Sequence, residues 1–305
     1  MSDLRGLLDP VGHGLLARTL ARCEADEVTG QVRAHGRPGG VFHLGRGRVV
    51  AVESPGAPGV EVLLLRSGRL SDREWADALA GGAPAGCPGA ALVARGVVGA
   101  AELRVLRVLA LRDAVFAVLA GRITACATAA AAGPGLASLG GSEGSEDPGA
   151  EPGADPGVGP GVEPARLLGE AARRLAALAA LSTAVLPDRH RLAPASAAAA
   201  RVDRLPAARR EILFLADGRR TARDIAFVSG RGVYPVTVEA SRMLADGLLV
   251  RARPGPAAVG LAVPGPGAPV LGRRAPGERA PAPTVDLPRR SPGASALMRP
   301  ADPGG

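Results

Sequence analysis

Arginine carries most of the chemistry that this chain could perform. Between Arg201 and Arg253 the sequence holds eleven arginines and six acidic residues, an excess of about five positive charges. Guanidinium groups bind phosphate, so this segment could hold a nucleic-acid backbone. The DNA-binding candidates are Arg219, Arg220, Arg223, Arg231 and Arg251, which cluster outside the third expected helix, and Thr237, Ser241 and Arg242, which we expect to face base edges from that helix. The third helix also carries Glu239, which would repel phosphate, so an arginine-rimmed protein-binding surface is an equal alternative.

Residues typical of other chemistries do not form recognisable sites. The four histidines have no cysteine or carboxylate at metal-ligand spacing, and Cys23, Cys87 and Cys126 are far apart. The chain contains no lysine, which excludes a Walker-type phosphate loop, and no GxSxG nucleophile elbow is recognised between a strand and a helix. We therefore predict no catalytic residue, no metal site and no cofactor, and we expect the protein not to be an enzyme.

The arginine-rich segment has the pattern of three short helices and a strand. Pro206 stands at the start of the first helix, and Thr221 with Asp224 forms a capping box at the second. The stretch "DGLLVRARPG" predicts a following strand. This pattern resembles the winged helix-turn-helix domains of bacterial regulators, loosely of the MarR kind.

The sequence pattern of the N-terminal part predicts a small antiparallel sheet followed by helical hairpins. Glycine turns separate short apolar runs in "TGQVRAHGRPGGVFHLGRGRVVAVES". Further on, "LLRSGRLSDREW" repeats as "LVARGVVGAAEL" with an offset of 28 residues, and Gly68 and Gly96 match as helix C-caps. The stretch "GGVFHLGRGRVVAVESPGAPGVEVLLLRSGRL" at 39–70 resembles the PatA-type N-terminal (PATAN) domain of bacteria, and the resemblance covers roughly residues 1–130. That resemblance implies an α+β signalling or adaptor module, found near small Ras-like GTPase and roadblock systems.

Composition divides the chain into four parts. We expect a PATAN-like α+β domain at 1–130, an acidic Gly/Pro-rich disordered linker at 131–163, a helix plus winged helix at 164–253, and a disordered Pro/Gly/Arg tail at 254–305. The amphipathic segment 164–186 could pack on its own domain or form a homodimer. No apolar run suits a membrane span and no signal peptide is recognised, so a cytoplasmic location is expected.

Two functions remain open from the sequence. One is a transcriptional regulator with a PATAN-like input module and a DNA-binding winged helix. The other is a signalling adaptor of a small-GTPase or roadblock pathway, which binds a protein partner and does not bind DNA. The polarity of the third helix, where one arginine stands beside one glutamate, does not separate them.

Overall fold

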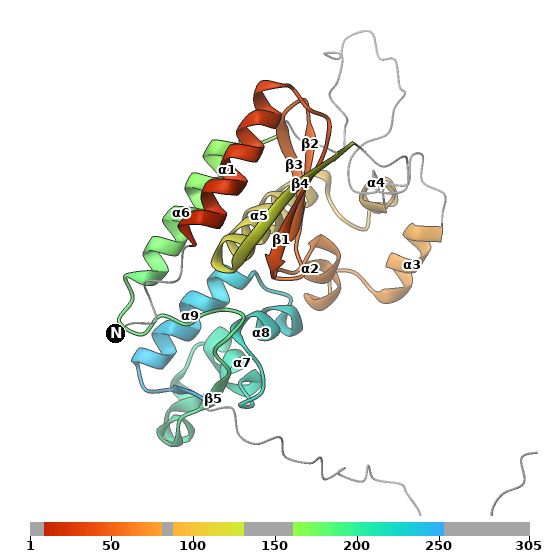
Figure 1. The fold of residues 1–305 in the computed structure, drawn as a ribbon. Helices are drawn as coiled ribbons and strands as arrows, with labels where there is room; N and C mark the ends of the chain where they lie inside the picture. The colour runs from red at the N-terminus through yellow and green to blue at the C-terminus, as the bar shows by residue number, and fades with distance from the viewer. Residues whose placement is uncertain (1–8, 81–87, 131–160, 253–305) are drawn as a thin grey trace, which may run out of the picture. The chain divides into compact units, whose positions relative to one another are not determined.

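The structure is a computed structural model that describes residues 9–80, 88–130 and 161–252. Most of the expected linker and the whole of the expected tail lie outside these residues. The described residues form a mixed α and β fold with a small antiparallel sheet, as the sequence predicts. Figure 1 shows the helices gathered around this sheet.

The N-terminal half is built on a four-stranded antiparallel sheet with the order β3-β2-β1-β4. Helix α1 begins at Pro10, where the Asp9 carboxylate accepts the N–H groups of Val11 and Gly12. Buried side chains on one sheet face, among them Val32, Phe42 and Val49, form the core together with helices α1 and α5. The elements of this half are α1 (Pro10–Ala25), β1 (Gly30–Arg37), β2 (Gly40–Gly45), β3 (Arg48–Glu53), α2 (Val60–Arg66), α3 (Asp72–Ala80), α4 (Pro88–Ala94), α5 (Ala100–Ala120) and β4 (Arg122–Ala130).

The internal repeat is confirmed by the backbone of the two helical hairpins. Gly68 and Gly96 both adopt positive φ, at 71° and 70°, directly after α2 and α4. In each copy the apolar turn residue, Leu70 or Val98, is buried in a small cluster shared by the hairpins. A capping box between Ser71 and Glu74 begins the second helix of the first hairpin. A glycine that permits the left-handed turn therefore fixes the same hairpin geometry twice.

The described part of the C-terminal half contains four α-helices, a 3-10 helix and a two-stranded ladder. Its elements are α6 (Pro164–Ala179), β5 (Leu192–Pro194), the 3-10 helix η4 (Ser196–Arg204), α7 (Ala207–Leu215), α8 (Ala222–Ser229), α9 (Val233–Ala245) and β6 (Leu249–Arg251). Strands β5 and β6 pair antiparallel, and the predicted capping box of Thr221 and Asp224 begins α8. Gly230 ends α8 in the left-handed conformation, which lets the chain turn into α9.

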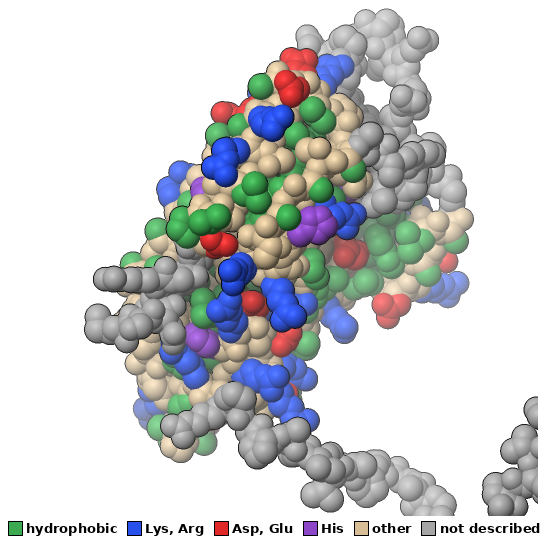
Figure 2. All heavy atoms as spheres, in the orientation of Figure 1, with side chains coloured by type: hydrophobic (Ala, Val, Ile, Leu, Met, Phe, Trp, Pro, Cys, Tyr) green, Lys and Arg blue, Asp and Glu red, His purple; other side chains and the backbone are tan. Residues whose placement is uncertain are grey.

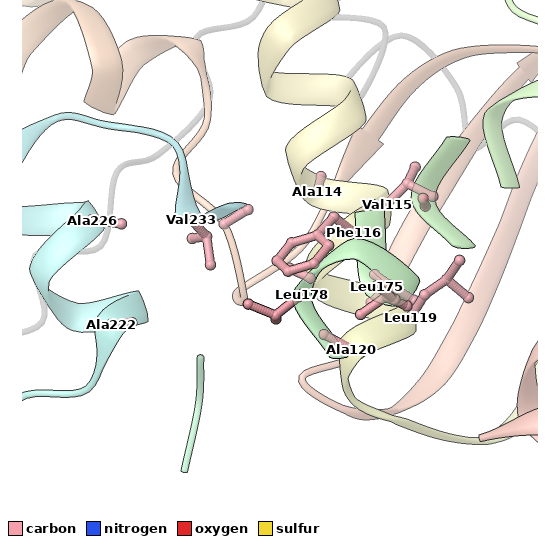
Figure 3. Packing of buried hydrophobic residues seen from close by; sticks show 14 of the residues in the cluster. Ala114, Val115, Phe116, Leu119, Ala120, Leu175, Leu178, Ala222, Ala226 and Val233 are labelled. Carbon is pink, nitrogen blue, oxygen red and sulfur yellow. The ribbon is translucent and has the colours of Figure 1, made fainter. Parts of the chain in front are cut away.

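Helix α6 joins the two halves. It packs along α5 and α1 of the N-terminal half, and its apolar side chains Leu168, Leu175 and Leu178 are buried there. Figure 3 shows Leu175 and Leu178 beside Phe116 and Leu119 of α5. Of the two alternatives that the sequence left open for 164–186, packing within the chain is the one seen in this structure, although the helix packs on the N-terminal half and not only on its own domain.

Among the described residues, no helix combines the length and the apolar character that a membrane crossing requires.

Candidate functional site

The third helix of the C-terminal half does not present the hydroxyls that sequence reasoning placed on DNA bases. Thr237 and Ser241 are 0% and 1% exposed. The Thr237 hydroxyl donates to the carbonyl of Val233, and that of Ser241 donates to the carbonyl of Thr237. The Ser241 oxygen also accepts the N–H of Val185 at 3.0 Å. The expectation that both residues are exposed was wrong, because a hydroxyl bonded to the carbonyl one turn earlier can be buried at little cost.

Three of the candidate arginines bind backbone carbonyls of the chain itself. Arg220 Nη1 donates to the Leu215 carbonyl at 3.2 Å. Arg223 Nε donates to the Pro55 carbonyl at 2.8 Å, which links α8 to the loop after β3. Arg251 Nη2 donates to the Ala184 carbonyl at 2.7 Å, which ties β6 to the segment after α6. These guanidinium groups hold the fold together, so their charge is only partly available to a ligand.

Candidate arginines also lie on the surface, mostly beside acids. Arg219 is exposed, and its backbone N–H is accepted by Asp217 at 2.8 Å. Figure 2 shows arginines over the C-terminal half with acidic side chains among them. The ion pairs are Arg220 with Asp217 at 3.4 Å, Arg231 with Glu211 at 3.8 Å and Arg242 with Glu239 at 3.7 Å. The charges of Arg220, Arg231 and Arg242 are therefore each partly neutralised by a neighbouring acid.

The first turn of α9 is closed by a carboxylate from α5. Gly232 occupies the N-cap position and has no side chain to accept a hydrogen bond, while Pro235 has no N–H. The N–H groups of Val233 and Tyr234 therefore need an acceptor from elsewhere. Asp113 supplies it: one carboxylate oxygen accepts the Val233 N–H, and the other accepts the Tyr234 N–H at 2.8 Å.

Aromatic and cationic side chains surround this contact. The rings of Phe116 and Tyr234 meet edge to face at 5.0 Å, and the Arg174 guanidinium lies 5.0 Å from the centre of the Tyr234 ring. Asp113 is 4% exposed, and burial raises the pKa of its carboxyl group, although the two N–H groups and the Arg174 charge oppose that shift. Helices α5, α6 and α9 thus meet at one buried acid.

Sequence reasoning missed Asp113, although two signals point to it. Asp113 directly precedes the apolar run "AVFAVLA", whose residues are expected to be buried. Separately, the helix that begins after Gly232 has no cap of its own. Neither signal indicates that the acid and the uncapped helix contact each other, because Asp113 and Gly232 are 119 positions apart in the sequence. Only the folded chain shows the pair.

A cavity of about 950 Å³ lies where the sheet, α2, α5 and α8 approach one another. Its lining is largely apolar, and it includes Trp75, Ala110 of α5 and Phe227 of α8. Arg223 also lines it, and its guanidinium lies 5.4 Å from the centre of the Phe227 ring. An apolar hollow with a few polar groups on its wall is typical of a ligand or peptide site.

The described residues contain no cluster of His, Cys, Asp and Glu suited to hold a metal ion. Comparison with known proteins gives no relative: no family model, no curated protein and no solved structure matches the chain.

Proposed function

We propose that the protein is a non-enzymatic adaptor that binds another protein, and that α9 does not read DNA in this arrangement. The observation that carries the proposal is the closed first turn of α9. Winged-helix and other helix-turn-helix proteins contact base edges with the N-terminal residues of the recognition helix. Here those residues, Val233 and Tyr234, lie against α5 with their N–H groups bonded to Asp113.

The cavity beside α8 is the proposed partner site. Its apolar lining suits an apolar segment of a protein partner, and Arg223 on its wall suits an acidic group on that segment. The resemblance of the N-terminal half to PATAN domains supports a signalling partner from a small-GTPase or roadblock pathway. In this proposal the winged-helix-like half serves as a wall of the site.

Filling the cavity tests the partner site. Ala110 is 8% exposed and lines the cavity, so Ala110→Phe should occupy part of it. Ala101 is an exposed residue of the same helix that is not among the lining residues, so Ala101→Phe is the matched control. We expect the immobilised full chain to capture the same partner from nuclease-treated host lysate with the control variant, and at least about tenfold less with Ala110→Phe, a loss of about 1.4 kcal/mol. Equal capture by both variants would reject the cavity as the partner site.

The second candidate function is a DNA-binding regulator whose helix α9 is held against α5 in this structure. The exposed positions of Arg219 and Arg242 support it. In that case the hydrogen bonds of Asp113 would hold α9 against α5, and loss of these bonds would expose the start of α9. Fluorescence anisotropy of labelled duplex DNA with the full chain and with Asp113→Ala separates the two functions. The adaptor proposal expects no preference among DNA sequences from either protein, whereas sequence-selective binding that appears on Asp113→Ala would favour the regulator.

A further inference from the structure

One face of the sheet carries a row of basic side chains along β1. Neighbouring residues of a strand point to opposite faces, and Val32 and Ala34 point into the core. Arg33, His35 and Arg37 therefore point to the other face, and all three are exposed. At about 3.3 Å per residue, successive members of this basic row are about 6.6 Å apart.

Arg122 of β4 extends the basic row at one end and is counted with it below. Arg122 is exposed and lies directly opposite Arg37 in the register of β1 and β4, so the two like charges repel each other. The three arginines of the row form no ion pair within the described part of the chain. Glu53 is in line with Arg33 across the sheet, but it lies two strands away and pairs with His43 at 3.2 Å. An acidic ligand would supply the counter-charge that the described neighbours do not.

The basic row begins at the proposed partner site. Arg33 and His35 line the cavity, and so does Val41, which lies opposite Arg33 on β2. Arg223 adds a further positive charge on the cavity wall. A segment that enters the cavity is therefore already in contact with the first members of the row.

We propose that the basic row binds an extended acidic segment of the partner protein, with a carboxylate at every second residue, next to the apolar residues that enter the cavity. This inference rests on the proposed function, because it names the chemistry of the partner at that site. Alternate side chains of an extended peptide are about 6.6 Å apart, which is the spacing of the row. A carboxylate placed between Arg37 and Arg122 accepts hydrogen bonds from both guanidinium groups and relieves their repulsion.

The residues beside the row favour a protein segment over a nucleic acid. Proteins that hold single-stranded nucleic acids combine positive charge with aromatic side chains on which the bases stack. The cross-strand neighbours of Arg33 and His35 on this face are Val41, Ala127 and Ala125, none of which is aromatic. An extended peptide needs no stacking surface, and small neighbours leave room for its backbone.

Fluorescence anisotropy of the full chain with labelled peptides tests the proposal. The first probe begins with two leucines and continues with glutamate and threonine in alternation, so that every glutamate of the extended peptide points to one side. The second probe has the same composition, but its glutamates are consecutive, so that only every second one faces the row. An exposed ion pair contributes up to about fivefold in affinity. We therefore expect the second probe to bind about fivefold more weakly than the first.

A matched pair of variants locates the binding to the basic row. Arg33→Gln/Arg37→Gln/Arg122→Gln removes its three arginines and should weaken the first probe about tenfold. The control Arg18→Gln/Arg166→Gln/Arg204→Gln removes as much charge from exposed arginines outside this sheet face and should bind the first probe as the wild type does. Arg33→Glu/Arg37→Glu/Arg122→Glu should instead bind a probe with arginine in place of glutamate, which a misfolded chain could not do.

Several results would overturn the proposal. These are equal losses in the two glutamine variants, equal affinities of the wild type for the two probes, and no binding of the first probe to the wild type. A labelled oligothymidylate that binds the wild type more tightly than the first probe, and that the loss of the basic row releases, would overturn it too, because the occupant would then be a nucleic acid.

Ala110→Phe separates this inference from the proposed function on which it rests. If the cavity holds the leucines, Ala110→Phe should weaken the first probe and leave a version with serine in place of leucine unaffected. A first probe that binds Ala110→Phe as it binds the wild type, but weakens when the arginines of the row are replaced, rejects the cavity and keeps the row. The opposite pattern rejects the row and keeps the cavity.

Discussion

The buried acid at the junction of α5, α6 and α9 makes the sharpest prediction. Replacing Asp113 with alanine removes the acceptor of two backbone N–H groups in the first turn of α9. A buried donor left without a partner costs about 1–3 kcal/mol, so two give about 2–6 kcal/mol. Removing a buried charge offsets part of this cost, because burial of that carboxylate is itself unfavourable. We expect a net loss of about 2–3 kcal/mol in the free energy of unfolding.

The asparagine variant separates the charge from the hydrogen bonds. Asp113→Asn keeps one acceptor oxygen but turns an amide NH₂ toward the second N–H, so it should cost less than alanine and more than nothing. The pH dependence has a definite sign. Burial raises the pKa of Asp113 in the folded chain, so the folded state binds the proton more tightly than the unfolded state. Its stabilising contribution is present below the unfolded pKa and is lost as pH rises through the folded pKa.

Urea unfolding at several pH values between about 4 and 7 measures both effects. The difference in unfolding free energy between the wild type and Asp113→Asn should shrink as pH rises, by at most about 1.4 kcal/mol per pH unit. The chain has one tyrosine, Tyr234, so incorporated fluorotyrosine gives a single ¹⁹F signal at this contact. That signal should shift in Asp113→Ala. An unchanged stability and an unchanged signal in Asp113→Ala would refute the reasoning, and a difference that grows with pH would refute the pKa argument.

Two further predictions concern residues whose roles the structure reassigns or confirms. Ser241→Ala leaves the buried Val185 N–H without its acceptor, so thermal and urea unfolding should show a loss of about 1–3 kcal/mol in stability. In a binding assay, the affinity for DNA of any sequence should not change. A change in sequence preference without a loss of stability would contradict the burial of Ser241. Gly68→Ala and Gly96→Ala should each cost about 1–2 kcal/mol, since both glycines have positive φ while open space surrounds the added methyl group, and unequal costs would mean that the two hairpins are not equivalent.

Local signals in the sequence predicted local structure well. The sequence predicts the capping box at Thr221 and the paired glycines at 68 and 96 correctly, because each depends on residues within one or two turns of the chain. The small antiparallel sheet followed from the glycine turns between apolar runs. Strand β4 was not predicted, because its threonines and alanines carry no apolar alternation.

Burial that depends on distant partners was not predictable. The apolar stripe of α6 shows that one face is buried, but the stripe is the same whether its partner is α5 or another chain. The polarity of Thr237 and Ser241 predicts exposure, whereas the bonds of their hydroxyls to carbonyls within α9, and the bond from the Val185 N–H to Ser241, allow both residues to be buried. A sequence pattern treats every threonine and serine as polar, whereas a hydroxyl whose hydrogen bonds are satisfied inside the fold can be buried.

The chemistry of the Asp113 contact links the two candidate functions. The start of a helix carries unbonded N–H groups and a partial positive charge, so it binds an anion, and on DNA that anion can be a phosphate. In this chain the carboxylate of Asp113 has taken that place at α9. A phosphate and the carboxylate cannot both accept the N–H groups of Val233 and Tyr234. DNA binding through this turn would therefore require α9 to leave α5, which would break the Phe116–Tyr234 contact and expose the core around Val233. An adaptor needs no such opening, because its proposed site is formed while the contact is closed.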